Sequence, residues 1–241
     1  MRIDVTISAA EAASIFLQEK TAVVIDVLRA TSVITTALAH GARALYPTVL
    51  VEEAQAKAAE LHQEHPDAQV LLGGERHALR IPGFDLGNSP LEYTPAAVAA
   101  AHIVMTTSNG TRALHEAQRA ATVFIGCLLN AAAVAAAIRL SDEVVFICSG
   151  TADRLDISDC LAAGAIISQL RVAGLNLQLS DLAMVCEEYF QPQNYRKRIR
   201  ASLHGQRLLE LGLVADLDYC CQLNTLDIVP QYDGQRIVLP C

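Results

Sequence analysis

Ala22-Val23-Val24-Ile25-Asp26-Val27-Leu28-Arg29-Ala30-Thr31-Ser32, at residues 22–32, sets the architecture expected for this chain. Its first four residues form a short apolar, β-branched run that is typical of a buried parallel strand. A helical pattern then covers residues 33–40 and ends at Gly41. In open α/β sheets, ligands bind at the carboxyl ends of the strands, so Asp26 and Arg29 are candidate site residues.

Thr31 and Ser32 stand at the start of that helix. They can cap it, or they can hold a phosphoryl oxygen together with its free N–H groups. A structural alternative stays open, in which Asp26 and Arg29 form an ion pair and Thr31 only caps the helix.

Strand-like runs alternate with helical stretches over most of the chain. These runs cover residues 3–7, 22–27, 44–51, 69–72, 103–107, 123–127, 143–148 and 237–239. Such an order predicts an α/β fold, which we expect to be a three-layer α/β/α arrangement with a mixed, largely parallel sheet. After Asp153 the pattern is mainly helical, most clearly at residues 158–171, 181–190 and 206–211.

The length of 241 residues suits one α/β domain, residues 1–241. Two lobes around a cleft fit equally well, namely a strand-rich lobe at residues 1–150 and a mainly helical part at residues 151–241. No low-complexity linker separates the two parts.

A second polar segment concentrates turn-forming residues and charges where no core is built. Gly73-Gly74-Glu75-Arg76 precedes Gly83-Phe84-Asp85-Leu86-Gly87-Asn88-Ser89-Pro90. The glycines open backbone conformations that are closed to other residues, which leaves polar side chains free to bind a ligand. An ordered surface loop with Asx turns is the structural alternative. The candidate site residues are Glu75, Arg76, Asn88 and Ser89.

A third segment repeats the order of strand, polar turn and helix. Residues 103–105 are strand-like, Thr106-Thr107-Ser108-Asn109-Gly110-Thr111 forms the turn, and residues 112–120 are helical. Hydroxyl groups and a flexible glycine at a helix start can cradle an anionic oxygen, although such a turn alone is more often a helix cap. The candidates here are Asn109, Gly110 and Thr111.

A fourth segment has a competing interpretation. The strand-like run at residues 143–147 leads into Cys148, and Arg154 follows at the spacing used by cysteine-dependent phosphatases. Against this, Ile147 replaces the usual His and Asp153 places a carboxylate in a loop meant for anions. A buried Cys148 that fills apolar space is the favoured interpretation.

Together these motifs resemble those of the 2-phosphosulfolactate phosphatase family. The resemblance rests on the segments at residues 24–31, 74–76, 83–90, 106–111 and 148–151, in the same order, and it extends over nearly the whole chain. It implies a magnesium-dependent phosphatase that releases phosphate and 3-sulfolactate, a step of coenzyme M synthesis in archaea. Ser158 stands where the family typically shows Glu, so no ligand role is expected there, whereas Asp159 keeps its place.

The resemblance and the chemistry of phosphate esters suggest roles for these residues. Mg²⁺ prefers hard oxygen ligands, which suits Asp26, Glu75 and Asp159. Planar guanidinium groups match anions, so Arg29 and Arg76 join Asp26 and Glu75 in the predicted catalytic set. Water is favoured over Asp26 as the group that attacks phosphorus, because no second Asp follows at the usual spacing. The predicted substrate-binding residues are Thr31, Ser32, Asn88, Ser89, Asn109, Gly110 and Thr111.

Composition narrows the partners and the compartment. A formal net charge of −8 and the lack of a basic stripe argue against a nucleic-acid partner. Because the chain is acidic overall, positive charge must be supplied locally at a site that binds a small anionic phosphoester. Seven cysteines without zinc-type spacing, and no signal peptide, predict a reducing cytoplasm. The alanine-rich run at residues 131–138 is too short to span a membrane. Homodimerisation and a non-catalytic role as a binder of anionic metabolites remain open.

The only basic run, at residues 196–200, is expected to be a solvated helix face, with a lid or subunit contact as the alternative. His204 follows it in the chain. A half-exposed structural histidine is favoured there, and a proton donor to the leaving alkoxide is the alternative.

Overall fold

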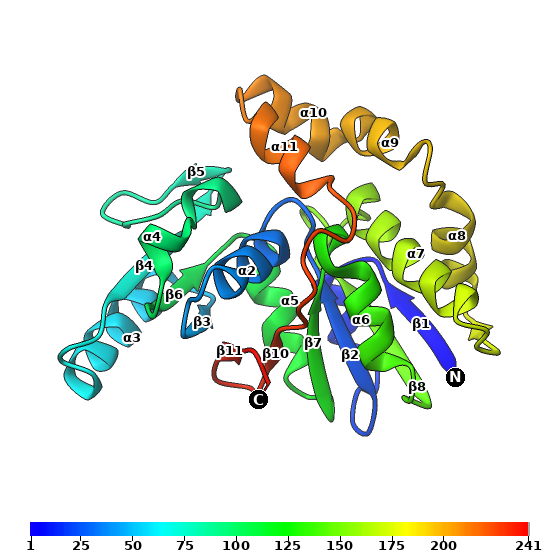
Figure 1. Cartoon of the computed structure of the whole chain (residues 1–241), viewed down its shortest axis with the longest axis horizontal. Helices are drawn as coiled ribbons and strands as arrows, with labels where there is room; N and C mark the ends of the chain where they lie inside the picture. The colour runs from blue at the N-terminus through cyan, green and yellow to red at the C-terminus, as the bar shows by residue number, and fades with distance from the viewer. Residues whose placement is uncertain (241) are drawn as a thin grey trace.

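A single mixed sheet organises the computed structural model, which describes residues 1–240. The strands follow the order β5-β4-β6-β3-β11-β10-β7-β2-β8-β1-β9 (Figure 1). Their bounds are β1 Arg2–Thr6, β2 Thr21–Ile25, β3 Ala44–Thr48, β4 Val70–Arg76, β5 Leu79–Arg80, β6 His102–Thr106, β7 Thr122–Gly126, β8 Glu143–Cys148, β9 Gln178–Leu179, β10 Gln231–Tyr232 and β11 Ile237–Val238. The predicted α/β class and the mixed, largely parallel sheet are confirmed.

Helices connect most of these strands. They are α1 Ala9–Ala12, α2 Ala30–Ala39, α3 Val51–Glu64, α4 Pro95–Val98, α5 Gly110–Ala117, α6 Ala131–Ile138, α7 Ile157–Val172, α8 Asp181–Tyr189, α9 Tyr195–Ala201, α10 Leu203–Glu210 and α11 Val214–Cys220, with short 3-10 turns at Pro90–Glu92 and Leu128–Asn130. Within residues 1–240, no helix has the length and apolar character needed to cross a lipid bilayer.

Two parallel sets of strands make up the sheet. One set is β7-β2-β8-β1-β9 and the other is β3-β6-β4. The hairpin of β10 and β11, red in Figure 1, lies between them and pairs antiparallel with β7 on one side and β3 on the other. Within the sheet, the two sets are therefore hydrogen-bonded to each other only through the last strands of the described chain, although they share a hydrophobic core cluster on one face.

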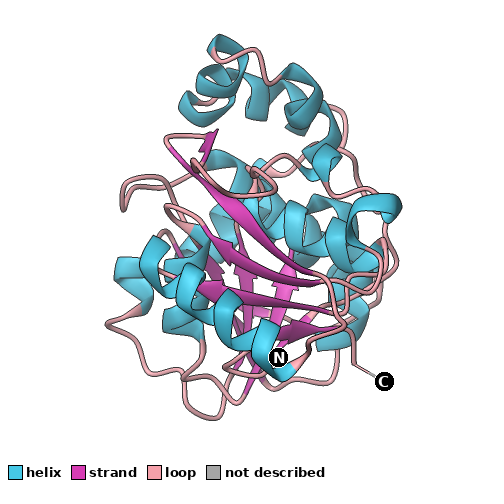
Figure 2. Ribbon diagram, turned by 90° about the vertical axis from the view of Figure 1, so that its left-hand side faces the viewer, coloured by secondary structure: helices cyan, strands magenta, loops and turns pink. Residues whose placement is uncertain are grey.

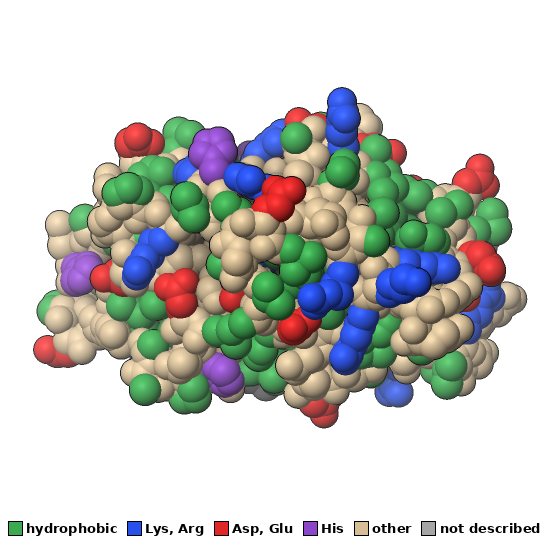
Figure 3. All heavy atoms as spheres, turned by 90° about the horizontal axis from the view of Figure 1, so that it is seen from above, with side chains coloured by type: hydrophobic (Ala, Val, Ile, Leu, Met, Phe, Trp, Pro, Cys, Tyr) green, Lys and Arg blue, Asp and Glu red, His purple; other side chains and the backbone are tan. Residues whose placement is uncertain are grey.

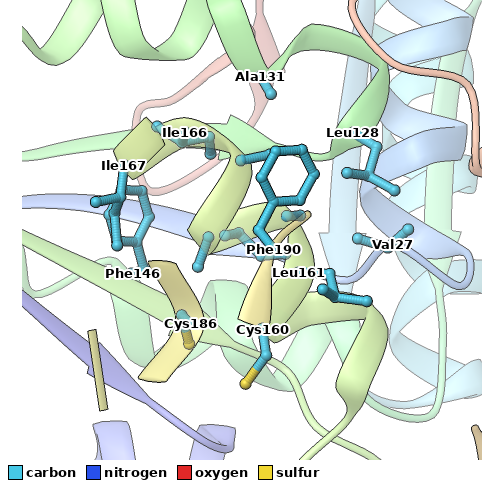
Figure 4. Close-up of a cluster of buried hydrophobic side chains, with 14 of the residues drawn as sticks. Val27, Leu128, Ala131, Phe146, Cys160, Leu161, Ile166, Ile167, Cys186 and Phe190 are labelled. Carbon is cyan, nitrogen blue, oxygen red and sulfur yellow. The ribbon is translucent and has the colours of Figure 1, made fainter. Parts of the chain in front are cut away.

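The sheet is buried on both faces, as its apolar strands predict. On β2, Val23 and Ile25 belong to one core cluster and Ala22 and Val24 to the other, because alternate residues of a strand point to opposite faces. Helices α6, α7 and α8 cover the first face, and α2 and α5 cover the second. Figure 4 shows part of the first cluster, in which Phe146 lies among side chains of α7 and α8. Figure 2 shows the sheet between its helices.

One helix start differs from the sequence expectation. Helix α2 begins at Ala30, three residues before the predicted start, and its N-cap residue is Arg29, which makes no side-chain cap bond. Thr31 and Ser32 therefore lie in the first turn, where each hydroxyl donates to a backbone carbonyl, that of Asp26 at 2.9 Å and that of Val27 at 2.8 Å. The alternative in which Thr31 only caps the helix does not hold, because Arg29 is the N-cap residue and the Thr31 hydroxyl donates back to the Asp26 carbonyl.

Helices α9, α10 and α11 lie above the carboxyl ends of the β2 set (Figures 1 and 2). This places the mainly helical part of the chain over the strand ends where ligands of α/β sheets bind.

Candidate active site

A cavity of about 590 Å³ lies at the carboxyl ends of β2, β6 and β8, beneath the start of α10. Asp26 follows β2, Asn109 follows β6, Asp156 follows β8, and His204 comes from α10. On the face seen from above, Lys and Arg side chains gather beside hydrophobic ones near the middle of the view (Figure 3). The acidic chain therefore does present positive charge locally on this face.

Asp26 is a buried carboxylate on this cavity, with 5% of its surface exposed. Its Oδ1 accepts a hydrogen bond from the Ala30 N–H at 3.1 Å, at the start of α2. Burial raises the pKa of Asp26 to about 6, although the charge of His204 and the Ala30 N–H oppose this. The carboxylate is thus fixed by its own loop and has few partners of its own.

Gly110 leaves the space that Asp26 occupies. A Cβ at position 110 would meet Asp26 Oδ2 at 2.7 Å and the Ala30 Cβ at 2.6 Å. Neither neighbour is the end of a flexible side chain, so the start of α5 can approach Asp26 only because residue 110 is glycine. The predicted role of Gly110 in substrate binding stays a prediction, and its observed role is to let two loops meet.

Arg29 reaches the same cavity and is 4% exposed. Its Nη1 donates to Asp216 of α11, a buried ion pair, and its Nη2 donates to the Ala78 carbonyl at 2.8 Å. The other Asp216 oxygen accepts from the Ser89 hydroxyl at 2.6 Å. The alternative in which Asp26 and Arg29 form an ion pair is therefore wrong, because the ion-pair partner of Arg29 is Asp216.

Glu75 lines the cavity and links two loops. Its Oε2 accepts from the Ala78 N–H and its Oε1 from the Ser108 N–H, each at 2.7 Å. The side chain is 7% exposed, so this carboxylate holds the β4–β5 turn against the loop after β6. Each oxygen keeps one lone pair for a further partner.

Asn88 also lines the cavity, is 6% exposed, and supplies a polar atom without a partner. Within residues 1–240, no donor hydrogen-bonds to its Oδ1. Buried polar atoms are nearly always hydrogen-bonded, so an unpartnered oxygen at a cavity points to a missing ligand.

Besides Ser89, Gly110 and Asp159, four predicted residues do not line the cavity. Arg76 donates to the Val49 carbonyl and to Thr106 Oγ1, each at 3.0 Å, and is not on the cavity. Thr111 exchanges hydrogen bonds with Thr107, and Thr31 and Ser32 are bonded within their own turn. The structure therefore gathers Asp26, Arg29, Glu75, Asn88 and Asn109 and leaves these four outside.

Asp159 is buried between the loops after β2 and β8 and does not line the cavity. Its Oδ1 accepts from the Val27 N–H at 2.9 Å, and its Oδ2 accepts from Gly150 N–H and the Ser149 hydroxyl at 3.2 Å each. Burial, together with the charges of Asp156 and Asp26, raises the pKa of Asp159 well above its usual range.

Residues from the helical part complete the cavity. Asp156 caps α7, and its Oδ2 accepts from the Thr151 hydroxyl at 2.8 Å and lies 2.7 Å from His204 Nδ1. The exposed arginines Arg154 and Arg207 also line it. Sequence analysis singled out His204 only as an alternative and missed Asp156 and Asp216. An aspartate before a helical run is an N-cap signal, but nothing local indicates its partner.

Cys148 does not face the cavity. It is 1% exposed, and a hydrogen bond to Cys160, together with burial, raises the pKa of its thiol well above the ordinary range. The basic run is likewise elsewhere, since Arg196, Arg198 and Arg200 contact Tyr195, Tyr189 and Asp218. The geometry supports the interpretations of Cys148 as an apolar filler and of the run as a surface face.

The donor atoms on the cavity suit a hard cation. Within residues 1–240, no group of three or more His, Cys, Asp or Glu side chains is arranged to hold a metal ion. Mg²⁺ needs no such group, since it usually binds one or two carboxylates and completes its shell with water and substrate oxygens. Asp26, Glu75 and the orphaned Asn88 oxygen fit that demand, whereas Asp159 has no access to the cavity.

Comparisons with known proteins identify the family. A family model described as 2-phosphosulpholactate phosphatase matches residues 8–235. A probable 2-phosphosulfolactate phosphatase of Symbiobacterium thermophilum is 43% identical over 226 residues, 92% of this chain and 95% of that protein. One of Clostridium tetani is 42% identical over 96% of this chain and 97% of its own, and one of Clostridium acetobutylicum is 40% identical over 99% and 100%. The chain belongs to the 2-phosphosulpholactate phosphatase family.

Proposed function

We propose that this chain is a phosphatase that hydrolyses 2-phosphosulfolactate to 3-sulfolactate and inorganic phosphate. One observation carries the proposal. Three chain segments, around β2, β4–β5 and the loop after β6, bring family-motif residues together at one cavity, where Asp26, Arg29, Glu75, Asn88 and Asn109 lie. The names of the relatives support the activity, and the shared position of these residues supports the cavity as the site.

Arg29 is the main anion-binding group in this proposal. A guanidinium carries five N–H donors, of which two are used, on Asp216 and the Ala78 carbonyl. The remaining donors can grip phosphoryl oxygens in a fixed direction, because the buried carboxylate of Asp216 holds the fork in place. The exposed Arg154 and Arg207 are suited to the carboxylate and sulfonate of the substrate.

We further propose that the enzyme depends on Mg²⁺, which Asp26, Glu75 and Asn88 would hold. The ion would neutralise charge on the phosphoryl group, which limits hydrolysis of phosphate esters. Both carboxylates line the cavity and are held by backbone N–H groups, and the unpartnered Asn88 oxygen supports the assignment.

Phosphate release from 2-phosphosulfolactate by the purified chain tests the proposal. We expect release that stops with chelator and returns with Mg²⁺, and slower release from a phosphorylated hydroxy acid without a sulfonate. Asp67→Asn, which changes an exposed aspartate outside the cavity, is the matched control and should leave the rate unchanged. Binding of the ester without phosphate release would instead make the chain a metabolite-binding protein.

The cysteine-dependent alternative is tested by Cys148→Ser. We expect this variant to retain activity, because the thiol is buried away from the cavity. Activity that resists chelator and is lost in Cys148→Ser would contradict the proposed mechanism.

A further inference from the structure

His204 is held as part of a buried acid–base pair at the cavity. It is the second residue of α10, and its side chain is 18% exposed while that of Asp156 is 3% exposed. Asp156 is itself fixed, because its Oδ1 accepts from the Ser158 N–H at 2.9 Å and its Oδ2 from the Thr151 hydroxyl at 2.8 Å. A carboxylate so restrained sets the orientation of any ring bonded to it.

That bond determines which ring nitrogen is available. Nδ1 lies 2.7 Å from Asp156 Oδ2 and 3.2 Å from Thr151 Oγ1, so its proton is directed at Asp156. Within residues 1–240, Nε2 has no hydrogen-bond partner, and the ring lines the cavity that holds Asp26 and Arg29. The proton on Nε2 is therefore the one that a bound ligand can receive.

We propose that His204 is the general acid that protonates the leaving alkoxide oxygen of the phosphate ester, with Asp156 as the residue that positions it. This inference rests on the proposed phosphatase function, and it adds a catalytic residue from the helical part of the chain. A secondary alkoxide is a poor leaving group, so the reaction needs a proton at that oxygen as the ester bond breaks.

The step balances as follows. Water forms the new P–O bond while the P–O bond to the substrate carbon's oxygen breaks, and that oxygen keeps the electron pair. It takes the Nε2 proton and becomes the hydroxyl of the product. The water loses a proton to solvent, and the neutral imidazole regains one from solvent, so the net reaction is ester plus water giving alcohol plus phosphate.

The surroundings of His204 favour the protonated ring. Burial by itself lowers the pKa of His204, but the hydrogen bond and charge of Asp156 outweigh it, with a further contribution from Asp26 against the opposing charge of Arg29, so the net direction is upward. The other charged or titratable side chains on the cavity are Glu75, His77, Arg154 and Arg207.

A second imidazole on the cavity lacks this support. His77 lies in the β4–β5 turn and is exposed, and no carboxylate of residues 1–240 is bonded to it. A ring without such a bond has no fixed direction. His204 is thus the better placed donor.

Dependence on the leaving group tests the assignment. The wild type, His204→Gln and the control His115→Gln, an exposed histidine away from the cavity, are assayed with Mg²⁺ on 2-phosphosulfolactate and on 4-nitrophenyl phosphate. Nitrophenolate leaves without a proton. We expect His204→Gln to lose about 100-fold or more in kcat on the alkyl ester and only a few-fold on the aryl ester, which is the usual range for a lost general acid. His115→Gln should match the wild type on both.

The failures are distinguishable. Equal losses on both esters, or no loss on the alkyl ester, would overturn the role of His204 and leave the phosphatase function intact. A wild type that releases phosphate from neither ester would overturn the function itself. A second measurement needs no turnover: ¹⁵N NMR of the wild-type ring should show Nδ1 protonated throughout and Nε2 titrating above the ordinary histidine pKa. A proton that leaves Nδ1 first would contradict the proposal even if His204→Gln failed to fold.

Discussion

The two walls of the cavity are built in different ways. The wall from the strand-rich part carries Asp26, Glu75 and Asn88, which are 5–7% exposed, and the two carboxylates are fixed by backbone N–H groups. The wall from the helical part carries Arg154 and Arg207, which are exposed, and Leu203, which is 91% exposed. In the proposed mechanism, the first wall holds the ion and the phosphoryl group, whereas the second recognises the rest of the substrate and supplies the proton from His204.

Two buried aspartates position groups at the cavity, and Asp216 also connects the two walls. Asp216 of α11 binds Arg29 and Ser89 from the strand-rich part, and Asp156 holds His204 from α10. Arg29 and His204 are thus each positioned by a buried acid. Mutations in each wall test the different roles of the two walls, starting with Asp216, which connects them.

Asp216→Ala should have the largest effect on stability. It leaves the buried Arg29 guanidinium without its counter-charge, which typically costs about 3–5 kcal/mol in the free energy of unfolding. Urea denaturation measures this. Asp218 lies on α11, as Asp216 does, and is an exposed ion-pair partner of Arg200. Asp218→Ala should therefore lower the free energy of unfolding by less than about 1 kcal/mol. Similar losses in the two variants would show that α11 is not a special anchor.

Asp26→Asn should reduce turnover by about 100-fold or more while leaving the fold intact. The amide keeps the shape of the side chain but removes a carboxylate whose burial already raises its pKa to about 6. Steady-state kinetics with Mg²⁺ and a thermal melt without Mg²⁺ test the two parts. A large drop in Tm with unchanged kcat would show that Asp26 is a structural residue and not a catalytic one.

The His204–Asp156 pair should give a defined pH dependence of stability. The pKa of His204 is raised from 6.5, so its contribution is complete below pH 6.5 and is lost as the pH rises through the folded-state value. The pKa of Asp156 is lowered from 3.8 to about 2 by His204, Ser158 and Thr151 against the effect of burial, so its contribution is present above pH 3.8 and is lost as the pH falls through about 2.

The stability difference between the wild type and His204→Gln should therefore be largest between these limits, at about 2 kcal/mol for a charge-assisted bond. Denaturation at a series of pH values measures it. A difference that grows above pH 6.5 would contradict the sign of the His204 shift.

Arg154→Ala should have the smallest effect, a rise in KM of about 3- to 10-fold with kcat nearly unchanged, because an exposed cation adds about 1 kcal/mol of binding. Arg154→Lys should recover part of it, and high salt should weaken the effect in the wild type. A fall in kcat would instead place Arg154 among the catalytic residues.

The sequence predicted six strands to within two residues, because short apolar runs followed by polar turns are local signals. It ended β3 three residues too late and β4 four residues too early, and it missed the two-residue strands β5, β9 and β10. It could not place Arg76, which follows Glu75 in β4, because adjacent residues of a strand point to opposite faces and only one of the two can reach the cavity. The early start of α2 directs the Thr31 and Ser32 hydroxyls to nearby carbonyls.

The positioning acids could not be predicted for a different reason. Asp216 lies 187 residues from Arg29, and Asp156 lies 48 residues from His204. Pairing over such separations depends on the assembled fold, and no spacing in the chain encodes it. The family motifs identified the cavity residues of the strand-rich wall. The positioning acids and the residues of the helical wall could be identified only from the three-dimensional structure.

The hairpin of β10 and β11 has a consequence for biosynthesis. Within the sheet, β3 and β7 are connected only through this hairpin. During synthesis, the two parallel sets of strands can therefore form first, and they can be connected only after Ile237 has left the ribosome. A protein that ends before residue 231 would therefore retain every residue that lines the cavity. It would lose the hairpin of β10 and β11, which connects the two parallel sets of strands within the sheet.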